Sequence, residues 1–320
     1  MDKVSPQVSI CLLTCNHLRY IRRCVESVVA QASDVSIDII IGDDCSDDGT
    51  SEIVAELAEK YPHLITHIRH SPRIGGSENY LSILRRMRGQ FIAHLDGDDY
   101  WLPGKLALQI DFLEKNSDYV SVYTNALTIN ELGDPVGLFN DAGEARIGLA
   151  ELLRAGNFLN NSSMLFRTSL RDAILDIDGP VLDFGVHLRH ARIGPIAQLA
   201  TTLIAYRMNS SVSMVAHAND QVRTLYWDAI MAVPRDRVTD NDFAYGVADF
   251  LRRVVMRAIR MRRWDLVREW APRVFAASPY GVIRTSILVA GSIFRITAKE
   301  LMGRFRKGPD GHRLKILYRR

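Results

Sequence analysis

The 320-residue sequence predicts an α/β fold, in which a mixed but mostly parallel sheet is flanked by helices and followed by a helical C-terminal extension. Two observations predict it. Between residues 8 and 96, short apolar runs rich in β-branched residues alternate with segments whose apolar residues recur at helical spacing. From residue 221 onward, mainly the helical pattern continues. Regular alternation of strands and helices is typical of a doubly wound, largely parallel sheet.

The same patterns give the order of the elements. In 19–31, for example, the apolar residues at 21, 24, 25, 28 and 29 would share one face of a helix. The segment 131–148 is rich in Gly and Asp and predicts a loop or hairpin, and 210–220 predicts a polar loop. Strands are expected at 8–14, 36–44, 64–70, 90–96, 119–129, 158–167 and 196–207, and helices at 19–31, 50–61, 77–88, 105–115, 181–194, 247–259 and 280–306.

Charge supports a division into a first domain at 1–220 and a basic helical region at 221–320. From Gly246 onward we count about 18 Lys and Arg against about 5 Asp and Glu, whereas the residues before it carry an excess of acids. A basic region of this kind favours an anionic partner, and an anionic membrane surface is one candidate. The alternative is a helical hairpin that packs on the first domain with a solvated basic face. Nucleic acid fits poorly, because basic and aromatic residues do not interleave as in known modules.

The cysteines and the N-terminal sequence indicate a cytoplasmic protein, and a peripheral position on the inner face of a membrane is the further expectation. Cys11, Cys15, Cys24 and Cys45 lack the CxxC spacing of a zinc site, and we expect reduced, buried thiols; a catalytic thiol is the alternative. The start "MDKVSPQ" does not resemble a signal peptide. Arginines interrupt the longest apolar stretch, in 280–298, so we expect no ordinary transmembrane helix.

Three carboxylates follow the strand expected at 90–96. Asp96, Asp98 and Asp99 lie within "FIAHLDGDDYW", and like charges this close repel one another. A hard divalent cation, Mn²⁺ or Mg²⁺, would relieve that repulsion and would take its other ligands from phosphate oxygens. Gly97 would let the backbone approach such a ligand closely. The alternative is that Asp-Gly-Asp-Asp only makes a turn.

A second group of polar residues is expected at the same edge of the sheet. Asp43 and Asp44 end the strand at 36–44, and the Thr14–Asn16 turn follows the first strand. The carboxyl ends of parallel strands meet in one crevice, where such folds bind ligands. The alternative for the acidic segment is capping of the helix that follows it. No phosphate-binding G-x-x-x-x-G-K-[ST] loop and no G-x-G-x-x-G after the first strand are present, so a dinucleotide-dependent oxidoreductase is improbable.

Taken together, these segments resemble the family 2 glycosyltransferases, which have the Rossmann-like GT-A fold. The resemblance rests on "VSICLLTCN", "IIIGDDCSDDGT" and "GGSENYLSILRRMRGQFIAHLDGDDYW", and continues in "NNSSMLFRTS", "LDFGVHLRHARIG" and "IAYRMNSSVS". It covers about residues 6–215. It implies an inverting, metal-dependent hexosyl- or N-acetylhexosaminyltransferase that moves a sugar from a nucleotide-sugar donor, usually a UDP-sugar, to an acceptor hydroxyl. The acceptor would be a glycan or a lipid-linked glycan.

The resemblance also implies roles for individual residues. Asp98 matches the carboxylate that binds the metal, and Asp96 matches the one that contacts the donor and the metal waters. Asp183 matches the general base of the acceptor side, whereas without the resemblance it would be interpreted as a helix cap. Asp43 and Asp44 match the pair that contacts uracil, and which of the two makes the contact is open. Arg73 would pair with the diphosphate. The full set of positions implied for donor binding is Thr14, Asn16, Asp43, Asp44, Arg73, Asn79, Asp96 and Gly97.

Departures from the family pattern support an alternative function. Leu182 precedes the expected base where Glu is common, and Asn209 stands where His is common. A catalytically inactive nucleotide-sugar-binding scaffold protein is therefore the second hypothesis. A sugar nucleotidyltransferase is disfavoured, because its basic phosphate loop after the first strand is missing. His94 and His187 lie in apolar patterns and are expected to be packed rather than to bind a metal.

Overall fold

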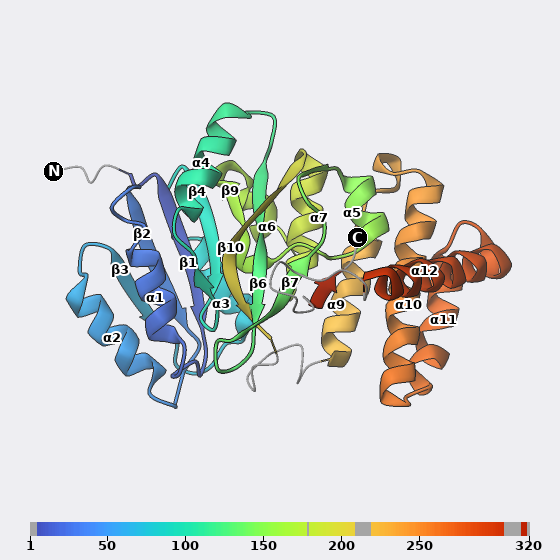
Figure 1. The fold of residues 1–320 in the computed structure, drawn as a ribbon, viewed down its shortest axis with the longest axis horizontal. Coiled ribbons are helices and arrows are strands. Elements are labelled where there is room, and N and C mark those ends of the chain that lie inside the picture. Colours follow the sequence, from blue (N-terminus) through green and yellow to red (C-terminus); the bar gives the residue numbers. More distant parts are fainter. Residues whose placement is uncertain (1–4, 178, 209–218, 304–314, 319–320) are drawn as a thin grey trace.

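The computed structural model describes residues 5–177, 179–208, 219–303 and 315–318. It confirms the predicted α/β fold. One mixed sheet runs through the molecule in the order β11-β7-β6-β9-β4-β1-β2-β3, and β10 joins it through β6 and also pairs with β5 and β8. Helices cover the sheet, and further helices follow at the C-terminal end (Figure 1).

The first half is the expected parallel unit. Strands β1 (Val8–Thr14), β2 (Ile37–Asp43), β3 (Ile65–Arg69) and β4 (Phe91–Asp96) are parallel and alternate with helices α1 (Ile21–Val29), α2 (Thr50–Lys60) and α3 (Gly76–Leu84). The strand register aligns their carboxyl ends, because Thr14 is opposite Asp43 and Leu13 is opposite Asp96. This alignment brings the polar segments after three strands to one edge of the sheet.

The second half departs from simple alternation. It contains β5 (Tyr100–Trp101), α4 (Lys105–Lys115), β6 (Ser121–Ile129), β7 (Pro135–Asn140), β8 (Ala145–Ile147), α5 (Leu149–Ala155), β9 (Leu165–Arg167), α6 (Arg171–Leu175), α7 (Asp183–Ile193) and β10 (Ile196–Arg207). The hairpin expected within 131–148 is present, since β6 and β7 are antiparallel. The strand expected at 158–167 is wrong for most of its length. Asn161–Ser163 form a 3-10 turn, in which the Ser162 hydroxyl donates to Asp99 and the Ser163 hydroxyl donates to the carbonyl of Asn160.

The C-terminal region is helical and then returns to the sheet. Helices α9 (Asn219–Met231), α10 (Asp240–Met261), α11 (Asp265–Ala277) and α12 (Gly281–Gly303) follow one another, and β11 (Lys315–Tyr318) pairs in parallel with β7. The sequence analysis did not predict this last strand. Helix α10 packs against α5, α11 and α12, and Phe250 of α10 contacts the rings of Trp227 and Trp270.

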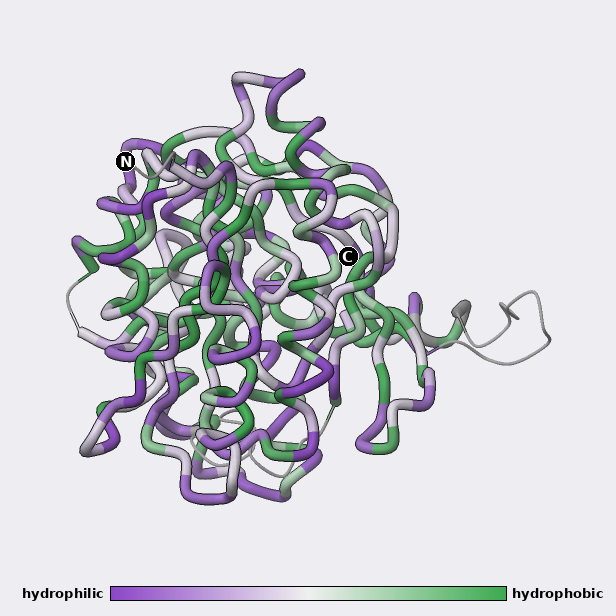
Figure 2. The backbone as a smooth tube through the Cα atoms, turned by 90° about the vertical axis from the view of Figure 1, so that its left-hand side faces the viewer, coloured by the Kyte–Doolittle hydropathy of each residue, from purple (hydrophilic) through white to green (hydrophobic). Residues whose placement is uncertain are grey.

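Hydrophobic residues line the central strands, and hydrophilic ones gather at peripheral loops and turns (Figure 2). Among the described residues, one helical segment, Gly281–Lys299 in α12, has the length and composition to cross a membrane, and only 17% of its apolar window is buried inside the protein. This segment contains the two arginines, Arg284 and Arg295, on which the expectation of no ordinary transmembrane helix was based.

Candidate active site

The candidate site lies where β1, β2 and β4 end side by side. Gly97, in the turn after β4, donates its N–H to the carbonyl of Leu13 at 2.8 Å. A Cβ atom at this position would lie 2.7 Å from His17 Nδ1 and 2.9 Å from both the Leu13 carbonyl oxygen and Thr14 Oγ1. Only glycine therefore allows the turn that carries the carboxylates to approach the Thr14–His17 turn.

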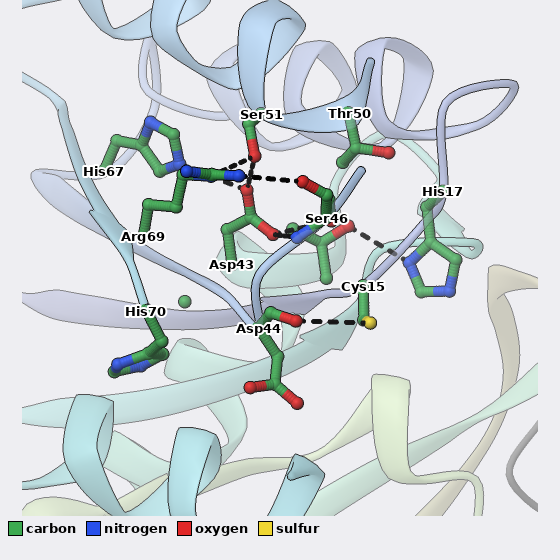
Figure 3. Close-up of polar contacts among 12 residues, drawn as sticks. Cys15, His17, Asp43, Asp44, Ser46, Thr50, Ser51, His67, Arg69 and His70 are labelled. Carbon is green, nitrogen blue, oxygen red and sulfur yellow. Dashed lines mark hydrogen bonds and ion pairs between the residues drawn. The ribbon is translucent and has the colours of Figure 1, made fainter. Parts of the chain in front are cut away.

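Asp43 organises the loop after β2 (Figure 3). Its side chain is fully buried, one oxygen accepts from the N–H and hydroxyl of Ser46 at 3.0 and 2.6 Å, and the other accepts from Ser51 and lies 3.6 Å from His67 Nε2. Burial favours the neutral acid, but hydrogen bonds from His67, Ser46 and Ser51 hold the pKa of Asp43 well below its usual range. Both oxygens are thus engaged by the protein.

Asp44 and Arg73 join this loop to the one before α3. The Asp44 carboxylate accepts from the backbone N–H groups of Ile74 and Gly75 at 2.7 and 2.9 Å. The Arg73 guanidinium donates through Nε and Nη2 to the carbonyls of Asp44 and Cys45, both at 3.1 Å. Arg73 therefore lies beside the predicted nucleotide loop, and two of its N–H groups hold that loop in shape.

Thr14, Asn16 and Asn79 also lie at this edge. Asn16 adopts a left-handed conformation, with φ of 59°, and its backbone and side chain bond to Ser46 Oγ and to the Asp47 N–H. Thr14 Oγ1 is 3.2 Å from His17 Nδ1. The buried Asn79 donates to the Gly42 carbonyl at 2.8 Å, and its Oδ1 is 3.1 Å from His70 Nε2. Asn79 thus supports the end of β2 from behind the loop.

The acidic cluster has members in different environments. The Asp96 side chain is 42% exposed, and its Oδ1 lies 3.0 Å from His94 Nε2. Asp99 is buried and accepts from Ser162 Oγ at 2.6 Å and from the Arg207 N–H at 2.8 Å. Burial raises the pKa of Asp99, and the charges of Asp98 and Asp96 raise it further. Burial also opposes ionisation of Asp96, but the charge and hydrogen bond of His94 hold its pKa below the usual value.

The carboxylates fit a divalent cation that keeps ligands from other sources. Among the residues the structure describes, no three His, Cys, Asp or Glu side chains are arranged to enclose a metal by themselves. Asp99 is buried and accepts from two protein donors, whereas Asp96 and Asp98 are partly exposed and are the candidate ligands. One or two carboxylates completed by waters and phosphate oxygens is the usual arrangement for Mg²⁺.

Asp183 lies at the first turn of α7, with a partner that the sequence did not reveal. Asn157 donates from Nδ2 to Asp183 Oδ2 at 2.9 Å, and the Phe184 N–H donates to Oδ1 at 2.6 Å. Burial raises the pKa of Asp183, and the negative charge of Asp96 adds to the increase. The influence of Asp96 on this pKa indicates that Asp183 lies in the neighbourhood of the acidic cluster.

His94 and His187, which could have been metal ligands, are packed in the interior, as predicted. His94 is 2% exposed and contacts the ring of Tyr80 edge-on. His187 is fully buried, and its Nδ1 lies 3.2 Å from Asn157 Oδ1. Since Asn157 uses its amide hydrogens on Asp183, its oxygen accepts from His187, which places the imidazole proton on Nδ1. Burial lowers the pKa of His187 well below its ordinary value, so the ring is neutral.

The thiols also behave largely as expected. All four cysteines are free, Cys11 and Cys24 are buried, and Cys15 and Cys45 are half-buried. Burial raises the pKa of Cys11, Cys24 and Cys15. These thiols are protonated at neutral pH, which argues against a catalytic thiolate at those three positions.

Sequence reasoning missed three polar residues that shape the site. Ser162 joins Asp96 and Asp99, and Asn157 holds Asp183. Arg207, at the end of β10, lies over the ring of Tyr20 and donates to the carbonyls of Asp98, Asn130 and Glu131. Its sequence signal was the segment "IAYR", which ends the last predicted strand. Asn209 lies outside the described residues.

The chain matches known glycosyltransferases over the part that holds this site. Residues 9–142 match the family model described as Glycosyl transferase family 2. An uncharacterized protein of Mycobacterium tuberculosis is 29% identical over 69% of this chain, and the match spans 64% of the length of that relative. The putative teichuronic acid biosynthesis glycosyltransferase TuaG of Bacillus subtilis is 27% identical over 72% of this chain and 86% of its own.

A solved structure agrees with the fold. The crystal structure of residues 1–349 of TarS from S. aureus, in complex with UDP-GlcNAc, superposes with a TM-score of 0.66 and covers 94% of both chains at 17% identity. At this identity the likeness concerns the fold alone. Residues 9–142 are therefore assigned to glycosyltransferase family 2 by their match to its model, and the chain has the GT-A fold.

Proposed function

We propose that the protein is an inverting glycosyltransferase that moves a sugar from a UDP-sugar to an acceptor hydroxyl, with Mn²⁺ or Mg²⁺ as cofactor. The observation that carries the proposal is the alignment of the ends of β1, β2 and β4, which brings the acidic turn of Asp96 and Asp98 beside the loop of Asp43 and Asp44. Asp183 is the candidate base, because it begins α7 near enough for the charge of Asp96 to raise its pKa. The two relatives named as TuaG and TarS, a putative teichuronic acid transferase and a protein solved with UDP-GlcNAc, support the substrate class.

In this proposal each group has one task. Asp98 and Asp96 would hold the cation, which supplies Lewis-acid stabilisation of the departing diphosphate. The loop held by Asp43, Asp44 and Arg73 would cradle the nucleotide. Asp183 would take the proton of the acceptor hydroxyl as its oxygen attacks the sugar from the face opposite the diphosphate, and a single displacement of this kind inverts the anomeric centre.

The environment of Asp183 suits a base. Burial and Asp96 raise the pKa of its carboxyl, so that it accepts a proton more readily than an exposed aspartate, while Asn157 and Phe184 keep it oriented. We propose that the acceptor is a cell-surface glycan or a lipid-linked glycan, reached from the cytoplasmic face of a membrane. The division into 1–220 and 221–320 belongs to the same proposal.

The test is release of UDP from a panel of UDP-sugars by purified protein with Mn²⁺, in the presence and absence of candidate acceptors. We expect turnover in the wild type, loss of more than 100-fold in Asp183→Asn, and unchanged binding of UDP by that variant. Turnover equal in Asp183→Asn and wild type would refute the base. Tight UDP-sugar binding without turnover in either would favour the inactive scaffold.

A further inference from the structure

Helix α12 has four large apolar side chains on its solvent-exposed face, where a helix that only packs on the protein would carry polar side chains. Its residues Thr285, Val289 and Ser292 are buried, whereas Ile283 is 80%, Ile287 64%, Phe294 76% and Leu301 50% exposed. At 3.6 residues per turn, the four exposed residues fall within about 40° of one another, roughly opposite the buried face. We call these four residues the outer stripe.

The inner face of α12 fixes the helix on the protein. It packs against α10 and α11, and the Thr285 hydroxyl bonds to Ser278 at 2.6 Å. The helix lies across α10 and α11 (Figure 1), and the exposure of the outer stripe shows that the stripe is on the side away from them. Crossing a membrane would require α12 to leave this packing, whereas lying flat on a surface would not.

The charges beside the outer stripe identify what covers it. Arg284 and Arg295 are both exposed and, eleven residues apart, lie at nearly the same angle along one flank of the stripe. Within 281–299 the sequence has no Asp or Glu, and Lys299 is the remaining charged residue. A second copy of the chain docked through the same stripe in a two-fold arrangement would bring these cations close to their equivalents.

We propose that α12 is an interfacial helix that binds an anionic lipid bilayer, with Ile283, Ile287, Phe294 and Leu301 inserted among the acyl chains and Arg284 and Arg295 at the headgroups. An apolar stripe edged by arginines is the arrangement that such helices use, and arginine stems can extend along apolar surface while their charged ends stay in water. This inference does not depend on glycosyl transfer, since it concerns binding alone.

The test is flotation of the full chain with two kinds of vesicle. One is phosphatidylcholine alone, and the other is phosphatidylcholine with about 30% of the anionic lipid phosphatidylglycerol. We expect binding to the anionic vesicles only. The double change Ile287→Ser and Phe294→Ser should reduce the partition coefficient at least about tenfold. Arg284→Gln with Arg295→Gln should reduce it by about fivefold per arginine and should make the remaining binding less dependent on salt.

Matched controls separate the stripe from surface composition in general. Ile193→Ser removes a side chain that is 53% exposed at the end of α7, and Arg85→Gln removes an exposed arginine directly after α3. Both should leave vesicle binding unchanged, and melting temperatures should show that every variant is folded. Equal flotation of the stripe variant and wild type, or absence of wild-type binding, would overturn the proposal. So would light scattering that shows a wild-type dimer converted to monomer by the stripe change.

Discussion

Asn157 offers the sharpest way to perturb the candidate base without touching it. Its Nδ2 donates to Asp183 Oδ2 at 2.9 Å and its Oδ1 accepts from His187. Asn157→Ala removes the donor, which stabilises the ionised carboxylate. The pKa of Asp183, already raised by burial, should therefore rise further.

The size of the effect follows from the hydrogen bond that is lost. A bond to a charged acceptor contributes about 1.5–3 kcal/mol, and about 1.4 kcal/mol corresponds to one pKa unit, so the pKa should increase by about one to two units. The groups that also act on Asp183 are Phe184 N–H, His94 and Asp96, and all remain in the variant. Because the base works ionised, the limb of the profile where kcat/KM rises with pH should move upward by the same interval.

The assay is UDP release with Mn²⁺ between about pH 5 and 9, in wild type and Asn157→Ala. At pH values below the limb the variant should be about 10- to 100-fold slower, and above it the two should converge. Asn116→Ala is the matched control, because Asn116 also donates once, to the carbonyl of Phe112, but at the end of α4. A uniform loss of rate with an unmoved limb would show that Asn157 only supports the fold, and would refute the reasoning.

Three further changes test the strand ends. Gly97→Ala places a methyl group 2.7–2.9 Å from His17 and Leu13, so we expect about 1–3 kcal/mol of destabilisation in urea unfolding and a large loss of donor binding; an unchanged variant would contradict the close approach. Asp43→Asn should lower the free energy of unfolding by about 2–3 kcal/mol at pH 7, measured by urea unfolding. Since the folded-state pKa of Asp43 is depressed, its contribution is present above about pH 4 and is lost as the pH falls, so the wild type should lose more stability than the variant on acidification. Asn79→Ala, which removes the bonds to the Gly42 carbonyl and to His70, should raise KM for the donor more than it lowers kcat; a larger effect on kcat than on KM would argue against its place behind the donor loop.

The sequence predicted best where one physical rule acts alone. The parallel unit from β1 to β4 has continuous apolar strands and amphipathic helices, so periodicity located it and strand-end chemistry located Thr14, Asp43 and Asp96 at one edge. The stretch 158–167 misled because its serines bond to Asp99 and to backbone, a tertiary arrangement that leaves no local signal.

Long-range pairings explain what could not be predicted. Asn157 meets Asp183 across 26 positions, and β11 joins β7 from the far end of the chain. Neither contact has a periodic signature. The apolar stripe of α12 was not predicted for a related reason. Counting the arginines along the segment does not tell which residues lie on the inner face of the helix and which on the outer face.

The account depends most on the cation that Asp98 and Asp96 are proposed to hold against the donor diphosphate. Calorimetric titration of UDP into the full chain, with Mn²⁺ and with a chelator, tests this directly. We predict that Mn²⁺ strengthens UDP binding at least about tenfold in the wild type, which corresponds to about 1.4 kcal/mol, and has no effect in Asp98→Ala. Equal UDP affinity with Mn²⁺ and with chelator in the wild type would contradict the proposed site.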